Sequence, residues 1–564
     1  MTRTSWFITT RLRRVFVFVV LLVSQACAHA ATECAIATAH PLATRAGCDI
    51  LAQGGTAFDA AVAVSSALAV VEPYSSGLGG GGFYLLHRAA DGTDIFVDAR
   101  ETAPGQATPA FYVDKSGKPK ERLSLEGPTA AAIPGIPAAL DWIATRYATM
   151  PLVTTMACAI ELAERGFPAD SRYVWATGFR EVLLNRYPAA AAVFLDRGKR
   201  VAPGHVIRQP RLAATLKLIA AAGRDGFYRG EMARNMVDAV QAAGGLWTLR
   251  DLEGYRVVER EPFRFRFAGA RITTAPLPSS GGLVMAETFN ILSLLPLQQA
   301  AASQRAHYII EAMRRGYNDR ARYMGDPEFV QVPVAKLASR DYARNRAASI
   351  DPGHATPSSA LPSVADPVEG AQETTHFSII DGAGNRVAAT LSVNGPFGSG
   401  FVAGDTGVLL NNHMDDFALA VATPNLYKLV GNDANAIAPG KRPLSSMSPT
   451  FVEDDRGVLV LGTPGGSRII SMVVLGVLDY LLNSQVDVNR IVSLPRYHHQ
   501  YLPDRVEIEP EGFDDAWIAS LRSKGHLVES GRRRWGNMQA VFLDSRTGQR
   551  STASDPRGRA GVLF

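Results

Sequence analysis

The residue pattern of this chain changes abruptly at Thr374, and this junction constrains both the fold and the chemistry. Residues 351–372 carry many Pro, Ser, Ala and Gly and little apolar periodicity, which predicts an exposed loop. Directly afterwards, residues 375–380 alternate as a strand does, DGAGN supplies turn residues, and residues 387–393 alternate again. The sequence therefore predicts a β-hairpin whose first strand begins immediately after Thr374.

A break in the backbone before Thr374 would place a β-hydroxyl and a free α-amine on one residue. An α-amine has an unperturbed pKa of about 7.7 to 8.0, so it can take the hydroxyl proton at neutral pH. The same hydroxyl can attack the preceding carbonyl in the uncut precursor, and water then hydrolyses the ester. The junction predicts cleavage between Glu373 and Thr374 and a nucleophile that carries its own base. Taken alone, the two threonines also fit an ordinary start of a strand.

Length and composition are those of a globular protein. The chain has 564 residues, of which 47% are hydrophobic and 20% charged, and this excludes an intrinsically disordered protein. The formal net charge is +5, but Arg3, Arg11, Arg13 and Arg14 supply four positive charges before residue 30. The rest of the chain is nearly neutral, so its overall charge gives no argument for a nucleic-acid partner or an anionic surface.

The first thirty residues are typical of a secretory signal peptide. Arginines precede a short apolar run over residues 15–23, and small residues over 26–30 offer cleavage sites. The run is too short to span a bilayer, and no later stretch is long and apolar enough to do so. We therefore expect residues 1–30 to be removed on export to the periplasm or the exterior. The alternatives are an uncleaved anchor or a lipid on Cys27.

Cysteine and histidine spacing gives no sign of a metal site. Cys34, Cys48 and Cys158 remain after the signal peptide, and their odd number excludes a disulfide scaffold but leaves a Cys34–Cys48 bridge open. His498 and His499 are adjacent, so they would face opposite sides of a strand, and no HExxH or paired CxxC accompanies them.

Helix signals dominate the first half of the chain. Thr56 followed by Asp59 predicts a capping box before an almost wholly apolar, and therefore buried, helix. Residues 120–350 look largely helical, and the C-terminal third returns to strands between Gly and Pro turns. Residues 77–82 match GxGxxG, but a helix precedes them and a strand follows, the reverse of a dinucleotide site. No nucleophile elbow or Walker loop is present as a rival to Thr374.

Long motifs in order over nearly the whole mature chain resemble those of one known family. They are GGTAFDAAVAV (54–64), SSGLGGGGF (75–83), VDARETAP (97–104), PLPSSGG (276–282), TTHFSIIDGAGNRVAATLSVNGPFGSGFVAGDTGVLLNNHMDDF (374–417), PNLYKLVGNDANAIAPGKRPLSSMSPT (424–450), GTPGGSRII (462–470), PRYHHQYLPD (495–504) and ASDPR (553–557). The chain resembles the γ-glutamyltranspeptidases in all of them.

The resemblance implies an α+β N-terminal-nucleophile hydrolase: a four-layer αββα sandwich with two stacked, mostly antiparallel sheets. It implies a precursor that cuts itself into a large subunit, residues 31–373, and a small catalytic subunit, residues 374–564, which associate as a heterodimer. Family members transfer a γ-glutamyl group from glutathione or related amides to water, amino acids or peptides through an acyl-enzyme. No metal, organic cofactor or nucleic acid is implied, and no membrane span after signal cleavage.

Catalytic roles follow from motif position. Thr374 matches the nucleophile, and Ser392 stands where the family usually has threonine, with its hydroxyl placed to hydrogen-bond that of the nucleophile. Gly465 and Gly466 match the pair whose backbone N–H groups form the oxyanion hole. Because glycine lacks Cβ, these donors can approach the developing charge closely, although PGG alone is also an ordinary turn.

Donor-binding roles follow in the same way. Arg100 matches the arginine that clamps the α-carboxylate of the γ-glutamyl group, and Ser445 and Ser446 add hydroxyl donors. Asp416 and Asn394 match the acceptors for its α-ammonium group. Taken singly, each of these charged residues would fit a solvated surface.

His413 departs from the family pattern, because relatives usually have Gln or Glu at this position. A neutral imidazole can accept a hydrogen bond from the ammonium, whereas a protonated one repels it, so donor binding is expected to weaken at mildly acidic pH. Tyr427 matches the lid segment that covers the donor pocket in many bacterial relatives. The alternative functions are a cephalosporin-type or glutaryl acylase on the same scaffold, and a non-catalytic secreted binding protein.

Overall fold

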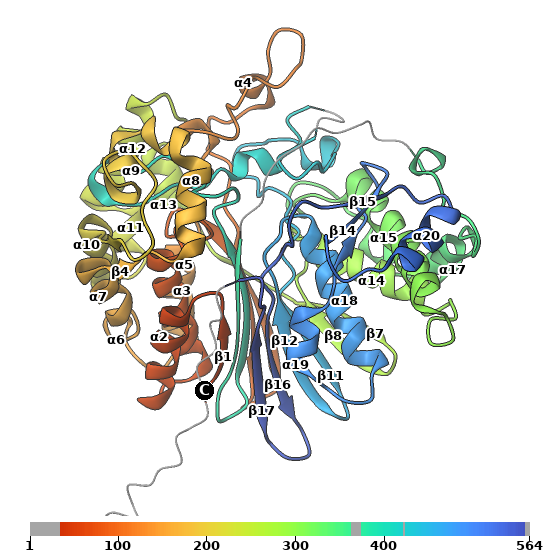
Figure 1. Ribbon diagram of the computed structural model, residues 1–564. Coiled ribbons are helices and arrows are strands. Elements are labelled where there is room, and N and C mark those ends of the chain that lie inside the picture. Colours follow the sequence, from red (N-terminus) through yellow and green to blue (C-terminus); the bar gives the residue numbers. More distant parts are fainter. Residues whose placement is uncertain (1–33, 363–373, 421–423, 559–564) are drawn as a thin grey trace, which may run out of the picture.

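Two β-sheets lie face to face between two layers of helices (Figure 1). The computed structural model describes residues 34–362, 374–420 and 424–558. The predicted signal peptide, and Glu373 on the far side of the predicted cleavage site, lie outside these residues. The layer order, helices, sheet, sheet, helices, confirms the predicted αββα sandwich.

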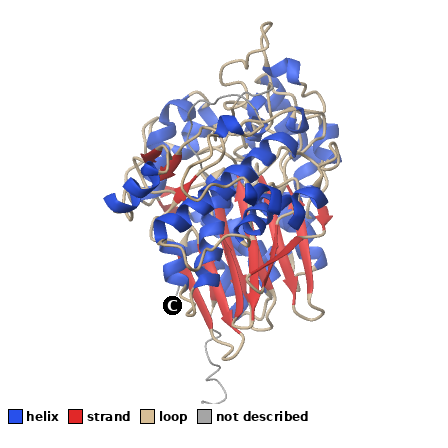
Figure 2. Ribbon diagram, turned by 90° about the vertical axis from the view of Figure 1, so that its right-hand side faces the viewer, coloured by secondary structure: helices blue, strands red, loops and turns tan. Residues whose placement is uncertain are grey.

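Each of the two central sheets has six strands, and all neighbouring strands are antiparallel. Their flat faces stack in the lower half of the view in Figure 2. The first sheet has the order β1 (Ala35–Thr38), β9 (Thr375–Ile380), β10 (Arg386–Ser392), β2 (Gly81–Arg88), β3 (Thr93–Ala99), β6 (Val258–Arg260). The second has the order β17 (Arg550–Ser554), β16 (Gln539–Asp544), β12 (Gly457–Gly462), β11 (Thr450–Asp454), β8 (Ala270–Thr274), β7 (Phe263–Phe267).

The first sheet is buried on both faces. In β2, Tyr84 and Leu86 pack in the hydrophobic cluster on the helix side, whereas Phe83 and Leu85 pack in the cluster shared with the second sheet. Successive side chains of a strand point to opposite faces, so a strand that is apolar at consecutive positions suits the middle of a layered fold. The junction at Thr374 therefore begins a strand that is buried on both sides.

Helices pack on the outer faces of both sheets. The layer beside the first sheet consists of α2 (Pro41–Ala52), α3 (Ala57–Val71), α5 (Ile136–Arg146), α6 (Leu152–Thr155), α7 (Ala157–Arg165), α8 (Ser171–Asn185), α9 (Pro188–Phe194), α10 (Pro210–Ala222), α11 (Asp225–Tyr228), α12 (Gly230–Ala242) and α13 (Leu249–Gly254). The layer beside the second consists of α14 (Gly281–Leu292), α15 (Ala302–Tyr323), α16 (Val334–Leu337), α17 (Arg340–Ala348), α18 (Arg468–Leu482), α19 (Val488–Ser493) and α20 (Asp515–Ser523).

Short elements complete the described chain. They are α4 (Pro109–Tyr112), the 3₁₀ turns η1 (Pro128–Ala130), η2 (Ser358–Ala360), η3 (Gly404–Thr406), η4 (His413–Asp416) and η5 (Asp433–Asn435), and the strands β4 (Phe167–Pro168), β5 (Val206–Ile207), β13 (Tyr497–His498), β14 (Val506–Ile508) and β15 (Val528–Ser530). No helix within the described ranges is long and apolar enough to cross a bilayer.

The predicted hairpin and capping box are confirmed. Strands β9 and β10 pair around a turn in which the Asp381 carboxylate accepts the N–H groups of Ala383 and Asn385. Thr56 and Asp59 exchange capping hydrogen bonds at the start of α3, all fifteen residues of which are buried. Both signals are local, so neighbouring residues suffice to specify them.

The prediction that residues 120–350 are largely helical is wrong for one segment. Strands β6, β7 and β8 occupy much of residues 258–274, where FRFRF in β7 alternates aromatic and basic residues with the period of a strand. Conversely, α18 lies within the C-terminal third, where strands were expected. Its nearly continuous apolar run does not distinguish a buried helix from a buried strand.

Cys34 and Cys48 form a disulfide that ties the residue before β1 to helix α2. The bridge that the sequence left open is therefore present. The thiol of Cys158 is free and half-buried in α7.

Candidate active site

Thr374 lies at the head of β9, beside the end of β10. The strand register pairs Thr375 with Leu391, so the next pair outward is Thr374 and Ser392. Their hydroxyl oxygens lie 3.3 Å apart, and both residues are buried. Two residues 18 positions apart thus form a hydroxyl pair because a tight hairpin aligns them.

One small cavity collects nearly all the residues predicted from the sequence. It is lined by Thr374, Ser392, Arg100, Asn394, His413, Asp416, Tyr427, Ser445, Ser446 and Gly466, together with Arg320, Leu429, Leu444, Met447 and Ile469. Gly465 is the exception, because it lines a larger cavity next door. The small cavity has a volume of about 20 Å³, room for roughly one water molecule. A larger ligand therefore requires side chains to move.

A buried network of charged groups occupies one side of the cavity. The Arg100 guanidinium contacts Asp416 in an ion pair and lies 3.5 Å from Glu101, while its Nε donates to the Pro443 carbonyl at 3.1 Å. Nδ1 of His413 lies 2.8 Å from Oε1 of Glu101, and Nε2 lies 4.0 Å from Oδ2 of Asp416. Arg100 and Asp416 thus form a buried ion pair, with Glu101 close to Arg100 and the His413 ring close to Asp416.

Neutral polar groups also line the cavity. The backbone N–H of Asn394 donates to Ser392 Oγ at 2.8 Å, and its side-chain amide donates to the Asn412 carbonyl at 3.0 Å. Asn394 has φ of +79°, a left-handed conformation that asparagine tolerates better than most residues. The Tyr427 hydroxyl contacts the Asn394 side-chain oxygen and donates to its carbonyl at 3.1 Å. Tyr427 therefore closes the cavity over Asn394.

Gly465 and Gly466 lie between β12 and α18, and Gly466 lines the same cavity as Thr374. Their φ angles are +142° and +55°, and a Cβ on Gly465 would lie 2.5 Å from Met472 Cε, so side chains are disfavoured there. At the end of β12, a Cβ on Gly462 would lie 2.3 Å from the His376 ring, so β12 packs directly on the start of β9. Within the described chain, no acceptor receives a hydrogen bond from either N–H of the glycine pair. Both N–H groups are therefore available as donors.

The two serines are braced by the PLPSSGG segment. The N–H of Ser445 donates to the Pro278 carbonyl at 2.8 Å, and the Ser445 carbonyl accepts from both the N–H and the hydroxyl of Ser280. The Ser445 hydroxyl accepts the N–H of Met447 at 3.1 Å. Ser446 is buried beside it. These contacts fix the backbone that carries both hydroxyls.

Glu101 and Arg320 belong to the site but were not singled out from the sequence. Glu101 directly follows Arg100 in VDARETAP, so that motif did carry a signal for it. Arg320 lies in α15 and donates from Nε to Ser280 Oγ at 2.9 Å, and burial lowers the pKa of its guanidinium to about 10. Nothing in the local sequence distinguishes Arg320 from the other arginines of α15.

Asp415 attaches the segment that carries Tyr427. Its carboxylate accepts the N–H of Leu426 at 2.7 Å and the hydroxyl of Ser124 at 2.9 Å. Burial, together with the charge of the neighbouring Asp416, raises the pKa of Asp415 to about 7 against the opposing effect of the two hydrogen bonds. The contact between η4 and the segment that carries Tyr427 therefore includes a carboxyl group whose pKa lies near neutral pH.

Asp415→Asn is expected to change how stability depends on pH. The pKa of Asp415 is about 7 in the folded state and about 3.9 in the unfolded state. Between these two pH values the carboxyl group is protonated in the folded state and ionised in the unfolded state. The free energy of unfolding of wild type therefore falls as the pH rises from about 4 to about 7. Asparagine does not titrate. The free energy of unfolding of the variant, relative to wild type, should therefore rise by up to about 4 kcal/mol between pH 4 and 8.

Urea unfolding at several pH values measures this difference. Asp405→Asn serves as the control, because the Asp405 side chain is 71% exposed and its variant should run parallel to wild type. A constant difference between Asp415→Asn and wild type across the pH range would contradict the expectation.

No group of three or more His, Cys, Asp or Glu residues suited to hold a metal occurs in the described part of the chain. His498 and His499 are both buried, and burial lowers the pKa of the two imidazoles to about 3 and about 4. His498 Nδ1 lies 2.6 Å from Ser471 Oγ, and His499 Nε2 lies 3.2 Å from Asp504. Their partners are those of core imidazoles.

A threonine at the head of a central strand, paired with a second hydroxyl in an αββα sandwich, defines the chain as an N-terminal-nucleophile hydrolase. Comparison with known proteins narrows the class. The family model described as Gamma-glutamyltranspeptidase matches residues 43–564. The chain therefore belongs to the γ-glutamyltranspeptidase family, as its motifs predicted.

Individual relatives agree with this assignment. The glutathione hydrolase proenzyme of Pseudomonas sp. (strain A14) is 42% identical over 84% of this chain and 83% of its own length. The glutathione hydrolase proenzyme of Escherichia coli (strain K12) is 40% identical over 93% and 90%. Among solved structures, a cephalosporin acylase from Bacillus halodurans superposes with a TM-score of 0.82 at 27% identity, covering 93% of this chain and 95% of that one.

Proposed function

We propose that this protein is a γ-glutamyltransferase and glutathione hydrolase that matures by cutting itself between Glu373 and Thr374. The observation that carries the proposal is the 3.3 Å contact between the Thr374 and Ser392 hydroxyls in a cavity that also holds Arg100 and Asp416. The names of the two proenzyme relatives support the same activity. The products of cleavage are residues 31–373 and 374–564, which remain associated.

Maturation uses the hydroxyl of Thr374. Its oxygen attacks the carbonyl carbon of Glu373, the C–N bond breaks, and an ester links the two residues. Water then hydrolyses the ester, which leaves a carboxylate on Glu373 and a free α-amine and hydroxyl on Thr374. Ser392, beside the reacting oxygen, stabilises the hydroxyl position during both steps.

Turnover repeats this chemistry on a bound amide. The α-amine takes the proton of the Thr374 hydroxyl, whose oxygen attacks the γ-carbonyl of the donor. The N–H groups of Gly465 and Gly466 donate to the oxyanion that forms. The C–N bond of the donor breaks, and its amine leaves with the proton that the Thr374 α-amine had taken. Water or an acceptor amine then attacks the acyl-enzyme. Hydrolysis releases glutamate, and transfer releases a new γ-glutamyl amide.

A bound donor would replace contacts that residues of the site make with one another. Arg100 pairs with Asp416 in a cavity of about 20 Å³. An α-carboxylate would take over Arg100, supported by the hydroxyls of Ser445 and Ser446, while an α-ammonium would take over Asp416. A γ-glutamyl group carries its carboxylate and its ammonium on one carbon. Its binding therefore replaces the ion pair between Arg100 and Asp416 with two ion pairs to the donor.

Asn394 and Tyr427 favour a transpeptidase over an acylase. Asn394 offers a second acceptor for the ammonium, and Tyr427 closes over it from the lid segment. The similarity to the cephalosporin acylase keeps acylase activity as the second candidate. A glutaryl amide lacks the ammonium, so it would leave the Asp416 carboxylate without its partner.

Two measurements test the proposal. The purified protein should give two fragments on a denaturing gel, the smaller one beginning at Thr374, and it should hydrolyse a γ-glutamyl anilide faster than the matching glutaryl anilide. Faster turnover of the glutaryl compound would establish the acylase instead. A single stable chain without turnover would establish a binding protein on an inherited scaffold.

Export to the periplasm or exterior is part of the proposal. The support is the signal-like sequence of residues 1–30 and the Cys34–Cys48 disulfide, since such bridges persist in oxidising compartments. N-terminal sequencing of the large fragment from the periplasmic fraction checks both the location and the cleavage site.

His413→Gln is expected to flatten the pH dependence of donor binding. The contact of Nδ1 with Glu101 favours a proton on that nitrogen, which leaves Nε2 as the acceptor of the neutral ring. A second proton on the ring would face the donor's ammonium, so KM of wild type should rise several-fold at acidic pH. KM of the variant should stay level over pH 5.5 to 8. An unchanged profile would remove His413 from ammonium recognition.

A further inference from the structure

A large cavity adjoins the catalytic one and is strongly basic. Its volume is about 1190 Å³, and Tyr427 lines both this cavity and the catalytic one. Gly465 lines the large cavity, and its neighbour Gly466 lines the catalytic cavity. The small cavity has no room for the part of a donor on the other side of the scissile bond from the γ-glutamyl group. The large cavity lies directly beside Gly465 and Gly466. The large cavity is therefore placed to receive the leaving-group side of a donor.

Eight residues that line the cavity are basic and three are acidic. The basic ones are Arg172, Lys428, Arg468, Arg505, Arg532, Arg533, Arg534 and Arg557. The chain as a whole has a net charge of only +5, and four of its arginines precede residue 30. The charge of the cavity is thus a local concentration and does not follow from a generally basic protein.

Some of these cations already have acidic partners. Arg505 contacts Glu507 at 2.9 Å and Glu529 at 2.8 Å, and Arg468 also pairs with Glu507. Arg557 is buried and pairs with Glu509 and Asp555, neither of which lines the cavity. These arginines are structural, and their pairing uses the acidic residues nearest to them.

The run Arg532–Arg534 is different. All three side chains are exposed, in the loop between β15 and β16. Arg534 is 4.0 Å from Glu511, itself 77% exposed, Arg533 stacks 4.9 Å over the ring of Trp175, and Arg532 forms no ion pair with any described residue. Three adjacent arginines repel one another unless an anion lies among them.

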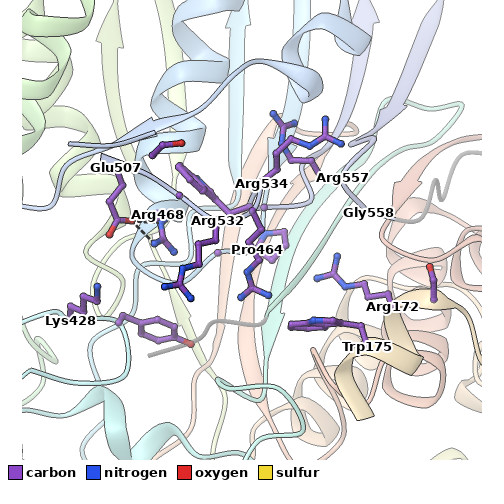
Figure 3. A pocket seen from close by; sticks show the side chains of 18 of the residues that line it. Arg172, Trp175, Lys428, Pro464, Arg468, Glu507, Arg532, Arg534, Arg557 and Gly558 are labelled. Carbon is purple, nitrogen blue, oxygen red and sulfur yellow. Dashed lines mark hydrogen bonds and ion pairs between the residues drawn. The ribbon is translucent and has the colours of Figure 1, made fainter. Parts of the chain in front are cut away.

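The opposite wall presents a matching surface. Figure 3 shows Arg172 and Trp175 on the α8 side of the cavity, and Arg532 and Arg534 on the side of the loop between β15 and β16. Guanidinium groups form paired hydrogen bonds with carboxylates, and the indole ring offers a flat apolar contact for a peptide backbone or side chain. The spread of cations over both walls suits several anionic groups along an extended chain.

We propose that this cavity binds acidic peptides carrying several carboxylates, as the leaving group of the donor or as the acceptor of the γ-glutamyl group. The proposal rests on the proposed function, and it adds a preference for the part of the substrate beyond the scissile bond. A single carboxylate, as on a neutral dipeptide, would occupy only a fraction of the cationic surface. A peptide with three or four would span from Gly465 to the Arg532–Arg534 loop.

The test compares two donors with the mature enzyme. One is γ-glutamyl-triglutamate and the other is γ-glutamyl-triglutamine, which has the same length without the side-chain charges. Wild type should show a kcat/KM about tenfold or more higher for the acidic donor at low ionic strength, and the ratio should fall as salt is added. Equal values for the two donors would overturn the proposal, while turnover of both keeps the proposed function.

A triple variant locates the effect. Arg532→Gln, Arg533→Gln and Arg534→Gln together should reduce the ratio of the two kcat/KM values to near one. The control triple, Arg197→Gln, Arg344→Gln and Arg546→Gln, removes the same charge from exposed residues that do not line the cavity, and it should keep the wild-type ratio. Equal loss in both triples would show a general charge effect and overturn the assignment to this cavity.

Binding measured without turnover serves as a second readout. Pentaglutamate should quench or shift the fluorescence of wild type through Trp175 and Trp535, which line the cavity, whereas pentaglutamine should not. A single-stranded oligonucleotide is the competing polyanion. If the oligonucleotide binds and pentaglutamate does not, the cavity is a nucleic-acid site and the peptide proposal is wrong.

Discussion

Thr374→Ala is expected to abolish both maturation and turnover. The variant lacks the hydroxyl proposed to attack the Glu373 carbonyl, so the chain should remain undivided on a denaturing gel. Activity toward a γ-glutamyl anilide should fall by at least about 1000-fold, because no acyl-enzyme can form. The Ser392 hydroxyl cannot take over the role of Thr374. Ser392 lies within the chain at the end of β10, so cleavage before residue 374 gives it no free α-amine.

Thr374→Ser is the matched control. It keeps the hydroxyl and the α-amine but loses a methyl group, so it should still divide into two fragments and turn over the anilide at a reduced rate. Mass spectrometry of the small fragment checks the cleavage position. Self-division of Thr374→Ala, or a small fragment of wild type that begins at another residue, would contradict the assignment of the nucleophile.

The local parts of the site were predictable from sequence. The change from loop to alternating strand marks Thr374, and the turn residues of the hairpin fix the register that brings Ser392 beside it. These features depend on residues within about twenty positions of each other, where turn chemistry and strand periodicity operate. The family resemblance then supplied roles for Arg100 and Asp416 that spacing alone does not give.

The long-range parts were not predictable in this way. Arg100 and Asp416 are 316 positions apart, and their contact depends on how the end of β3 meets η4. The basic cavity likewise joins the start of α8 to a loop 360 residues later in the chain, and neither segment alone indicates a shared site. Such contacts follow from the packing of whole layers, which no local pattern encodes.

Arg100→Lys is expected to weaken donor binding more than any other change in the recognition residues. The guanidinium contacts Asp416 while its Nε donates to the Pro443 carbonyl, and a lysine ammonium cannot reproduce this planar geometry. Loss of a two-pronged contact to the donor's α-carboxylate should raise KM by about 100-fold, corresponding to about 3 kcal/mol. The catalytic rate at saturation should change much less, because Thr374 and the glycine pair are intact.

A donor without the carboxylate separates recognition from general damage. The 4-aminobutyryl anilide keeps the amine of the γ-glutamyl group but lacks its α-carboxylate, so wild type and Arg100→Lys should turn it over equally poorly. Arg271→Lys is the control substitution, in a half-exposed ion pair with Glu453 on the second sheet, and should leave KM for both donors unchanged. If Arg100→Lys lowered turnover of both anilides by the same factor, Arg100 would hold the site together without binding the carboxylate.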